Sequence, residues 1–138
     1  MTVPRPALAL AIAGLIPFVG AGIASHTPLR VIEILGQPSE ILLTYGKIIL
    51  AFMGGCLWGF GARSDDALGL SLSISVLPAL YAFLIVGSSL YLLALGFALL
   101  LIADFWFAGR KLAPEWWISL RIPISAAAII SCLAGALS

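Results

Sequence analysis

Charged and metal-ligating residues are scarce in this sequence. Of 138 residues, 7 are Lys or Arg, 6 are Asp or Glu and 1 is His, which gives a net charge of +1. A near-neutral chain without a basic run does not have the pattern of a nucleic-acid-binding protein. One histidine and two cysteines in separate segments cannot supply a usual zinc site. We therefore expect no nucleic-acid partner, no metal and no cofactor.

Groups that support catalysis or cross-linking are equally few. Cys56 and Cys132 lie inside apolar segments and lack the CxxC spacing of redox or metal motifs. We interpret both as small buried packing residues rather than as a disulfide. His26 follows Ser25, but the sequence has no recognisable third catalytic group or oxyanion hole to accompany them. We expect that the protein is not an enzyme.

Apolar residues are what the chain has in abundance. They make up 62% of the sequence, and the mean hydropathy is +1.18. An average soluble domain is about 45–50% apolar, and a water-soluble core of this size has no room for the excess. We therefore predict one membrane domain over residues 1–138, with the lipid bilayer as its solvent.

Five segments are long enough to cross a bilayer, which takes about 20 apolar residues as a helix. They are approximately 6–24, 39–61, 67–86, 89–108 and 115–137. The first has features of a signal peptide, but we expect it to be retained as a transmembrane helix. The helix signals at 28–35 predict a short interfacial helix, with an ordinary polar loop as the alternative. The predicted fold is an all-α integral membrane protein, a compact bundle of five transmembrane helices.

Basic residues in the short loops predict the orientation of the bundle. Arg5, Arg63, Arg110 and Lys111 fall on one side of the membrane, and Arg30 falls on the other. We expect a multi-pass protein of the bacterial inner membrane, with a cytoplasmic N-terminus and the C-terminus outside. If the protein is organellar, the mitochondrial inner membrane takes this place.

The second segment combines one lysine with a group of glycines. Lys47 lies within an apolar segment. Its side chain either snorkels to the membrane interface or lines an internal pocket, and the sequence leaves both open. Gly55 and Gly59 have the small-xxx-small spacing that lets helices approach closely. With Gly54 and Trp58 they form a predicted helix-packing face. The alternative is a space for a ligand against Trp58.

Asp104 is the most informative single residue, because apolar residues surround it on both sides. A carboxylate inside a membrane segment faces protein and needs a partner. Arg121 enters the last segment at a comparable depth from the same side. We predict an Asp104–Arg121 pair with Trp117 against it, in a position from which its ring could stack on the guanidinium. An ion pair that fixes the bundle and a functional polar site or proton relay both remain open. The same face of the last segment continues with small or weakly polar residues, which we expect to point inward: Ser125, Ala128, Cys132 and Gly135.

A longer pattern runs along nearly the whole chain. It consists of Gly14-Leu15-Ile16-Pro17-Phe18, Tyr45-Gly46, Phe52-Met53-Gly54-Gly55, Trp58-Gly59, Gly96-Phe97, Asp104, Pro114-Glu115-Trp116-Trp117 and Leu120-Arg121. This pattern resembles the transmembrane protein 69-like family of small bacterial and mitochondrial membrane proteins, a domain of unknown function. The resemblance implies a multi-span inner-membrane protein and supplies no activity or substrate. Family members are commonly hydrophobic after the Tyr-Gly pair, so Lys47 departs from the pattern.

Three classes of function fit these features. The first is a non-enzymatic subunit, assembly factor or regulatory partner of a larger membrane complex, or a homo-oligomer, which suits the short loops and glycine-rich faces. The second is an oligomeric small-solute or proton-coupled transporter that uses Lys47, Asp104 and Arg121. The third is a small-molecule or lipid binder with a pocket near Trp58 or Trp117. The sequence favours them in that order.

Overall fold

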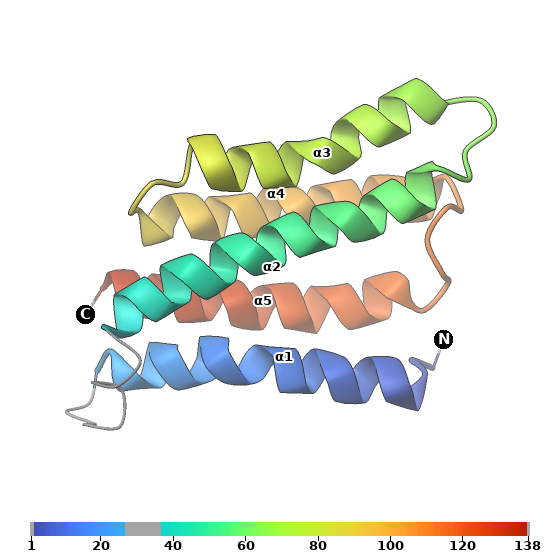
Figure 1. The fold of residues 1–138 in the computed structure, drawn as a ribbon. Coiled ribbons are helices and arrows are strands. Elements are labelled where there is room, and N and C mark those ends of the chain that lie inside the picture. Colours follow the sequence, from blue (N-terminus) through green and yellow to red (C-terminus); the bar gives the residue numbers. More distant parts are fainter. Residues whose placement is uncertain (1, 27–36, 138) are drawn as a thin grey trace.

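Five helices lie side by side with their long axes roughly parallel in the computed structural model, which describes residues 2–26 and 37–137 (Figure 1). They are α1 (Arg5–Ala24), α2 (Pro38–Gly61), α3 (Leu68–Leu84), α4 (Leu90–Gly109) and α5 (Trp117–Ala136). Four of them are long and apolar enough to cross a membrane, and α3 is a shorter apolar helix of 17 residues. The described residues contain no strand. The predicted all-α membrane bundle is confirmed.

The helix ends lie close to the segments expected from hydropathy. The largest differences are the end of α3 at Leu84 rather than 86 and the start of α5 at Trp117 rather than 115. The turn into α4 contains Gly87 with a φ of 54°, a left-handed conformation that favours glycine. A turn bond from the Trp117 amide to the Pro114 carbonyl precedes α5. The predicted interfacial helix at 28–35 lies outside the described residues.

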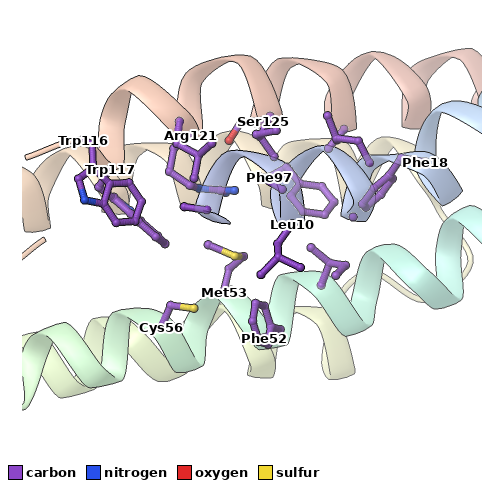
Figure 2. A pocket seen from close by; sticks show the side chains of 18 residues that line it. Leu10, Phe18, Phe52, Met53, Cys56, Phe97, Trp116, Trp117, Arg121 and Ser125 are labelled. Atoms are coloured by element: carbon purple, nitrogen blue, oxygen red, sulfur yellow. The ribbon is translucent and has the colours of Figure 1, made fainter. Parts of the chain in front are cut away.

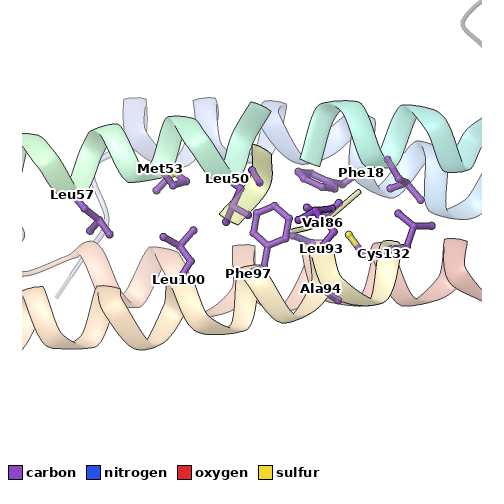
Figure 3. Close-up of a cluster of buried hydrophobic side chains, with 14 of the residues drawn as sticks. Phe18, Leu50, Met53, Leu57, Val86, Leu93, Ala94, Phe97, Leu100 and Cys132 are labelled. Atoms are coloured by element: carbon purple, nitrogen blue, oxygen red, sulfur yellow. The ribbon is translucent and has the colours of Figure 1, made fainter. Parts of the chain in front are cut away.

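Helix α2 is the packing axis of the bundle, because it contacts each of the other four helices. Leu50 and Leu57 on α2 pack with Leu93, Phe97 and Leu100 on α4 in a fully buried apolar layer (Figure 3). Glycines on α2 let the neighbouring helices approach it closely. The glycines that do so face α3 or α4 and recur at helical spacing: Gly46, Gly54 and Gly61.

Polar and aromatic contacts fasten α1 to the rest of the bundle. The Tyr45 hydroxyl on α2 donates to the Gly14 carbonyl at 2.8 Å. The Phe18 ring packs edge-on against Tyr45 and Phe97, with ring centroids 5.0 and 5.5 Å apart. Beyond α1, His26 Nε2 lies 2.7 Å from the carbonyl oxygen of Ala134 near the end of α5. The middle of α1 and the residues just after its C-terminal end are therefore held against other helices.

The two ends of the bundle differ in charge. The N-terminus, the α2–α3 connection and the α4–α5 connection lie at one end, which we call the N-terminal side (Figure 1). Arg5, Arg63 and Arg110 belong to this side. Arg110 Nη1 lies 3.9 Å from Asp66 Oδ1, so an exposed ion pair links the two connections there. The α3–α4 turn and the C-terminal end lie on the opposite side.

Candidate functional site

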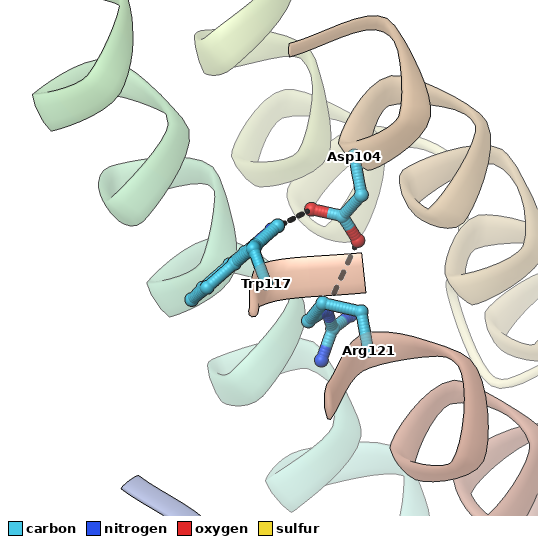
Figure 4. A network of polar contacts seen from close by, with 3 residues as sticks. All are labelled: Asp104, Trp117 and Arg121. Atoms are coloured by element: carbon cyan, nitrogen blue, oxygen red, sulfur yellow. Dashed lines mark hydrogen bonds and ion pairs between the residues drawn. The ribbon is translucent and has the colours of Figure 1, made fainter. Parts of the chain in front are cut away.

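A buried ion pair joins α4 and α5 near the N-terminal side. Arg121 Nε donates to Asp104 Oδ2 at 2.9 Å (Figure 4). The Asp104 side chain is 0% exposed and the Arg121 side chain 6%. Asp104 lies five residues before the end of α4, and Arg121 lies four residues after the start of α5, so both are about 6–8 Å inside their helices. The comparable depth follows from the similar number of residues that separate each of them from its helix end, as the sequence predicted.

Trp117 completes this arrangement in a different way from the one expected. Its indole Nε1 donates to Asp104 Oδ1 at 2.9 Å, rather than its ring stacking on the guanidinium. Phe60 on α2 packs edge-on against the Trp117 ring, with centroids 4.9 Å apart. A cation–π contact does form at this end, but between Arg110 and Trp106, at 4.7 Å. The predicted Asp104–Arg121 pair with Trp117 against it is present, and the contact that Trp117 makes is a hydrogen bond to the carboxylate.

Trp117 also determines how Arg121 can bind the carboxylate. A guanidinium that pairs side-on with a carboxylate donates to both oxygens. Here Trp117 occupies Oδ1, and only Oδ2 is bonded to Arg121, through Nε. Figure 4 shows a terminal nitrogen of Arg121 on the side away from Asp104. Nη2 is buried and has no hydrogen-bond partner among the described residues.

An apolar cavity of about 390 Å³ lies beside this unpaired nitrogen, between α1, α2 and α5. Arg121 and Ser125 line it from α5, and Met53 and Cys56 line it from α2 (Figure 2). Ser125 is 1% exposed, and its hydroxyl has no partner among the described residues either. Two residues that each hold a buried polar atom without a partner therefore line the same apolar space.

The cavity opens toward the lipid-facing surface. Leu10 of α1 and Phe52 of α2 are on its lining and are 75% and 63% exposed. On α1, small residues leave the space: Ala7, Ala11 and Gly14, which recur at a helical spacing of four and three. This spacing is the signal that the sequence reasoning missed. Cys56, interpreted as a packing residue, also borders the cavity.

A second apolar cavity of about 410 Å³ lies between α2, α3 and α4. It is lined by Leu50, Pro78 and Ala103, among others. None of the buried unpaired polar atoms found in the described residues belongs to its lining. This second cavity provides an internal comparison for the first, because it is similar in size and none of its lining residues holds one of the buried unpaired polar atoms.

Lys47 lies apart from the ion pair. It is half-buried on α2, nine residues before Cys56, or about 13 Å along the helix. In the described part of the chain it makes no hydrogen bond or ion pair, and it lines neither cavity. The structure thus does not bring Lys47 together with Asp104, Arg121 and Trp117.

The predicted helix-packing face divides into two parts. A Cβ added at Gly54 would lie 2.8 Å from the Ser75 carbonyl oxygen of α3, so this glycine does permit close packing. A Cβ at Gly55 or Gly59 would meet nothing within 4 Å, and Trp58 is 48% exposed. Among the described residues nothing packs closely on Gly55 and Gly59, and packing of a partner's helix there stays a prediction. Adjacent residues point about 100° apart on a helix, so Gly54 and Gly55 face different sides, and the G-x-x-x-G spacing does not say which side is covered.

The inward face predicted for α5 is present. Ser125, Ala128, Cys132 and Gly135 are all buried. No group of three or more His, Cys, Asp or Glu side chains with the arrangement of a metal site occurs among residues 2–26 and 37–137.

The fold and this site define a multi-pass α-helical membrane protein with a buried Asp–Arg pair beside an apolar cavity. The chain belongs to the family described as "Protein of unknown function (DUF3429)", whose model matches residues 3–137. This confirms the resemblance to transmembrane protein 69-like proteins. Transmembrane protein 69 of Xenopus tropicalis is 32% identical over 143 residues, which cover 93% of this chain and 52% of that protein.

A mammalian relative with the same name matches the chain over a similar length. Transmembrane protein 69 of Mus musculus is 28% identical over 139 residues, covering 93% of this chain and 54% of the relative. The chain thus spans about half the length of the curated relatives that it matches. No solved structure matches the chain.

Proposed function

We propose that this protein binds a lipid-soluble small molecule in the α1–α2–α5 cavity and performs no chemistry on it. The observation behind this proposal is that Arg121 and Ser125, each with a buried and unpaired polar atom (Nη2 and Oγ), both line an apolar cavity. A buried polar group without a hydrogen bond costs about 1–3 kcal/mol. A ligand with an acceptor atom would remove that penalty on binding. An apolar pocket with a few convergent polar groups is typical of small-molecule sites.

The position of the cavity favours a ligand that arrives from the bilayer. Its exposed lining residues, Leu10 and Phe52, belong to faces of α1 and α2 that contact lipid. A lipid-soluble molecule is concentrated in the bilayer and can enter sideways without crossing water. The cavity volume of about 390 Å³ falls within the range of about 300–1,000 Å³ common for ligand sites.

The test is to identify what purifies with the protein. The full chain is isolated in a mild detergent, extracted with organic solvent and analysed by mass spectrometry. Ala11→Phe places a ring in the cavity from α1, and Ala103→Phe places one in the second cavity as the matched control. We expect one compound enriched with the wild type and with Ala103→Phe and lost from Ala11→Phe. Equal recovery from all three proteins would rule out binding in this cavity.

A second candidate function is the subunit or partner role, which the sequence favoured first. It is supported by Gly55 and Gly59, which are exposed on α2 beside Trp58 and where an added Cβ would meet nothing within 4 Å. A helix of another subunit, or of a second copy, would approach closely there. A mild-detergent pull-down with mass spectrometry tests it: repeated recovery of one membrane complex, lost with Gly59→Leu, supports the role, and recovery of the chain alone contradicts it.

The transport hypothesis has less support than either. It requires Lys47, Asp104 and Arg121 along one hydrated path, whereas Lys47 lines neither cavity and the cavity beside Arg121 is apolar. For location, we propose the bacterial inner membrane with the N-terminus in the cytoplasm, or the mitochondrial inner membrane with the N-terminus in the matrix. The basic residues at the N-terminal side support this. Reporter fusions at the C-terminus that are active only outside the cytoplasm test the orientation.

A further inference from the structure

We infer that the cavity ligand presents an uncharged carbonyl oxygen to Arg121 Nη2 and Ser125 Oγ, and that Trp117 keeps Nη2 available for it. This inference rests on the proposed function and adds the chemical class of the ligand. It follows from three properties of the site: its donors, its charge and its depth in the membrane.

The donors determine what kind of atom the head group needs. A guanidinium nitrogen can only donate a hydrogen bond, and a serine hydroxyl can donate or accept. Arg121 and Ser125 are one helical turn apart, and both line the cavity. Figure 2 shows both side chains on the α5 side, facing Met53 and Cys56 on α2. A carbonyl oxygen, which accepts through two lone pairs, suits this pair.

The charge balance excludes an ionised head group. Asp104 already neutralises Arg121 at 2.9 Å. An anionic ligand would add a net buried negative charge next to this carboxylate, and a cationic ligand would face the guanidinium. In each case the binding free energy would include the desolvation cost of a buried charge that has no counter-ion of its own. An uncharged acceptor completes the hydrogen bonding and leaves the net charge at zero.

The depth of the donors also points away from ionised lipid head groups. Arg121 and Ser125 lie four and eight residues after the start of α5, about 6 and 12 Å along the helix. The hydrocarbon layer is about 30 Å thick, so both donors lie within it. The ligand therefore places its oxygen among apolar chains, as an ester or a quinone carbonyl does and an ionised phosphate does not.

Trp117 acts as a positioning residue for this contact. Its Nε1 donates to Asp104 Oδ1 and so competes with the guanidinium for that oxygen, while Nη2 is unpaired. Trp117→Phe removes this competing donor and retains an aromatic ring. Oδ1 then accepts from Nη2 without competition, although a carboxylate oxygen has room for two hydrogen bonds. We expect the ion pair to become bidentate and the recognition of carbonyl head groups to be lost.

Photolabelling in detergent tests the inference. The full chain in dodecyl maltoside, which has no carbonyl group, is labelled with a diazirine-bearing stearate methyl ester, and labelled residues are mapped by mass spectrometry. The competitors are methyl oleate, 1-octadecene, ionised oleate at about pH 9, and decylubiquinone. We expect methyl oleate or decylubiquinone to displace the cavity label at concentrations about tenfold below those of 1-octadecene and oleate. If methyl oleate displaces the label at the lower concentration, the ligand is an ester lipid; if decylubiquinone does, it is a quinone.

Variants separate recognition from structure. Trp117→Phe and Ser125→Ala should each reduce the preference for methyl oleate over 1-octadecene by up to about tenfold. Ser119→Ala, at an exposed position on α5, is the matched control and should keep the preference. Equal competition by all compounds, stronger competition by oleate, or an unchanged preference in Trp117→Phe would overturn the inference while leaving cavity binding intact. No label on any cavity residue would instead overturn the proposed function.

Discussion

Replacing Asp104 with leucine is the most direct perturbation of the buried pair. Leucine has the same branched arrangement of side-chain atoms but a larger volume, so the change removes the charge and the two accepting oxygens and also crowds a fully buried position. Arg121, at 5% exposure, would keep its charge with no carboxylate beside it. The Trp117 Nε1–H would lose its acceptor at the same time.

The expected loss of stability can be estimated from these two consequences. Removing one partner of a buried ion pair costs about 3–5 kcal/mol. Leaving a buried N–H without an acceptor adds about 1–3 kcal/mol. The free energy of unfolding should therefore fall by about 4–8 kcal/mol in Asp104→Leu. In the double variant Asp104→Leu/Arg121→Met the stranded charge is gone, so only the N–H penalty of about 1–3 kcal/mol remains.

Unfolding of the full chain in detergent micelles, titrated with sodium dodecyl sulfate and followed by tryptophan fluorescence, measures these differences. The double variant should be more stable than Asp104→Leu by about 3–5 kcal/mol. Asp104→Asn should fall between wild type and Asp104→Leu, because its amide oxygen can still accept from Trp117. A loss below about 1 kcal/mol in Asp104→Leu, or a double variant no more stable than the single one, would refute the reasoning.

Three further predictions concern single residues. Gly54→Ala should lower the free energy of unfolding by about 1–3 kcal/mol, because its Cβ would press on the Ser75 carbonyl. In the same unfolding assay, Gly55→Ala should be neutral or stabilising by up to about 1 kcal/mol. Equal effects of the two substitutions would contradict the faces assigned to these glycines. Ser125→Ala should raise the stability of the ligand-free protein by about 1 kcal/mol, since it removes a buried hydroxyl without a partner; a destabilised variant would mean that the hydroxyl is bonded. Ser89→Ala should cost about 1 kcal/mol, because the Ser89 hydroxyl accepts from the Leu92 amide at the start of α4, and Ser88→Ala next to it serves as the control.

Sequence reasoning succeeded where a local rule sets a strong energetic requirement. A carboxylate among apolar residues must be paired, and the fixed rise of a helix gives the depth of Asp104 and Arg121 without any knowledge of packing. The identity of the pair was therefore predictable. The role of Trp117 was not, because an indole can either stack on a cation or donate to an anion, and the choice depends on where Phe60 holds the ring.

The sequence alone could not predict which glycines are covered or where a cavity forms, because both depend on which helices pack against each other. The spacing of Gly55 and Gly59 is the same whether a neighbouring helix covers that side or not, and here α3 covers Gly54 instead. The cavity arises because small residues of α1 and α5 meet across one interface. The spacing of Ala7, Ala11 and Gly14 hints at such a space on α1, but only the packed bundle shows that no large side chain of α2 fills it.

The most direct test of ligand binding at Arg121 and Ser125 is a crystal structure of the full chain purified from its native membrane without added lipid. The account predicts a bound molecule in the α1–α2–α5 cavity, with an oxygen atom about 2.7–3.2 Å from Arg121 Nη2. Asp104 should accept from Trp117 and Arg121 Nε in that structure, as it does here. A collapsed cavity, with Arg121 bound to both oxygens of Asp104, would contradict the account.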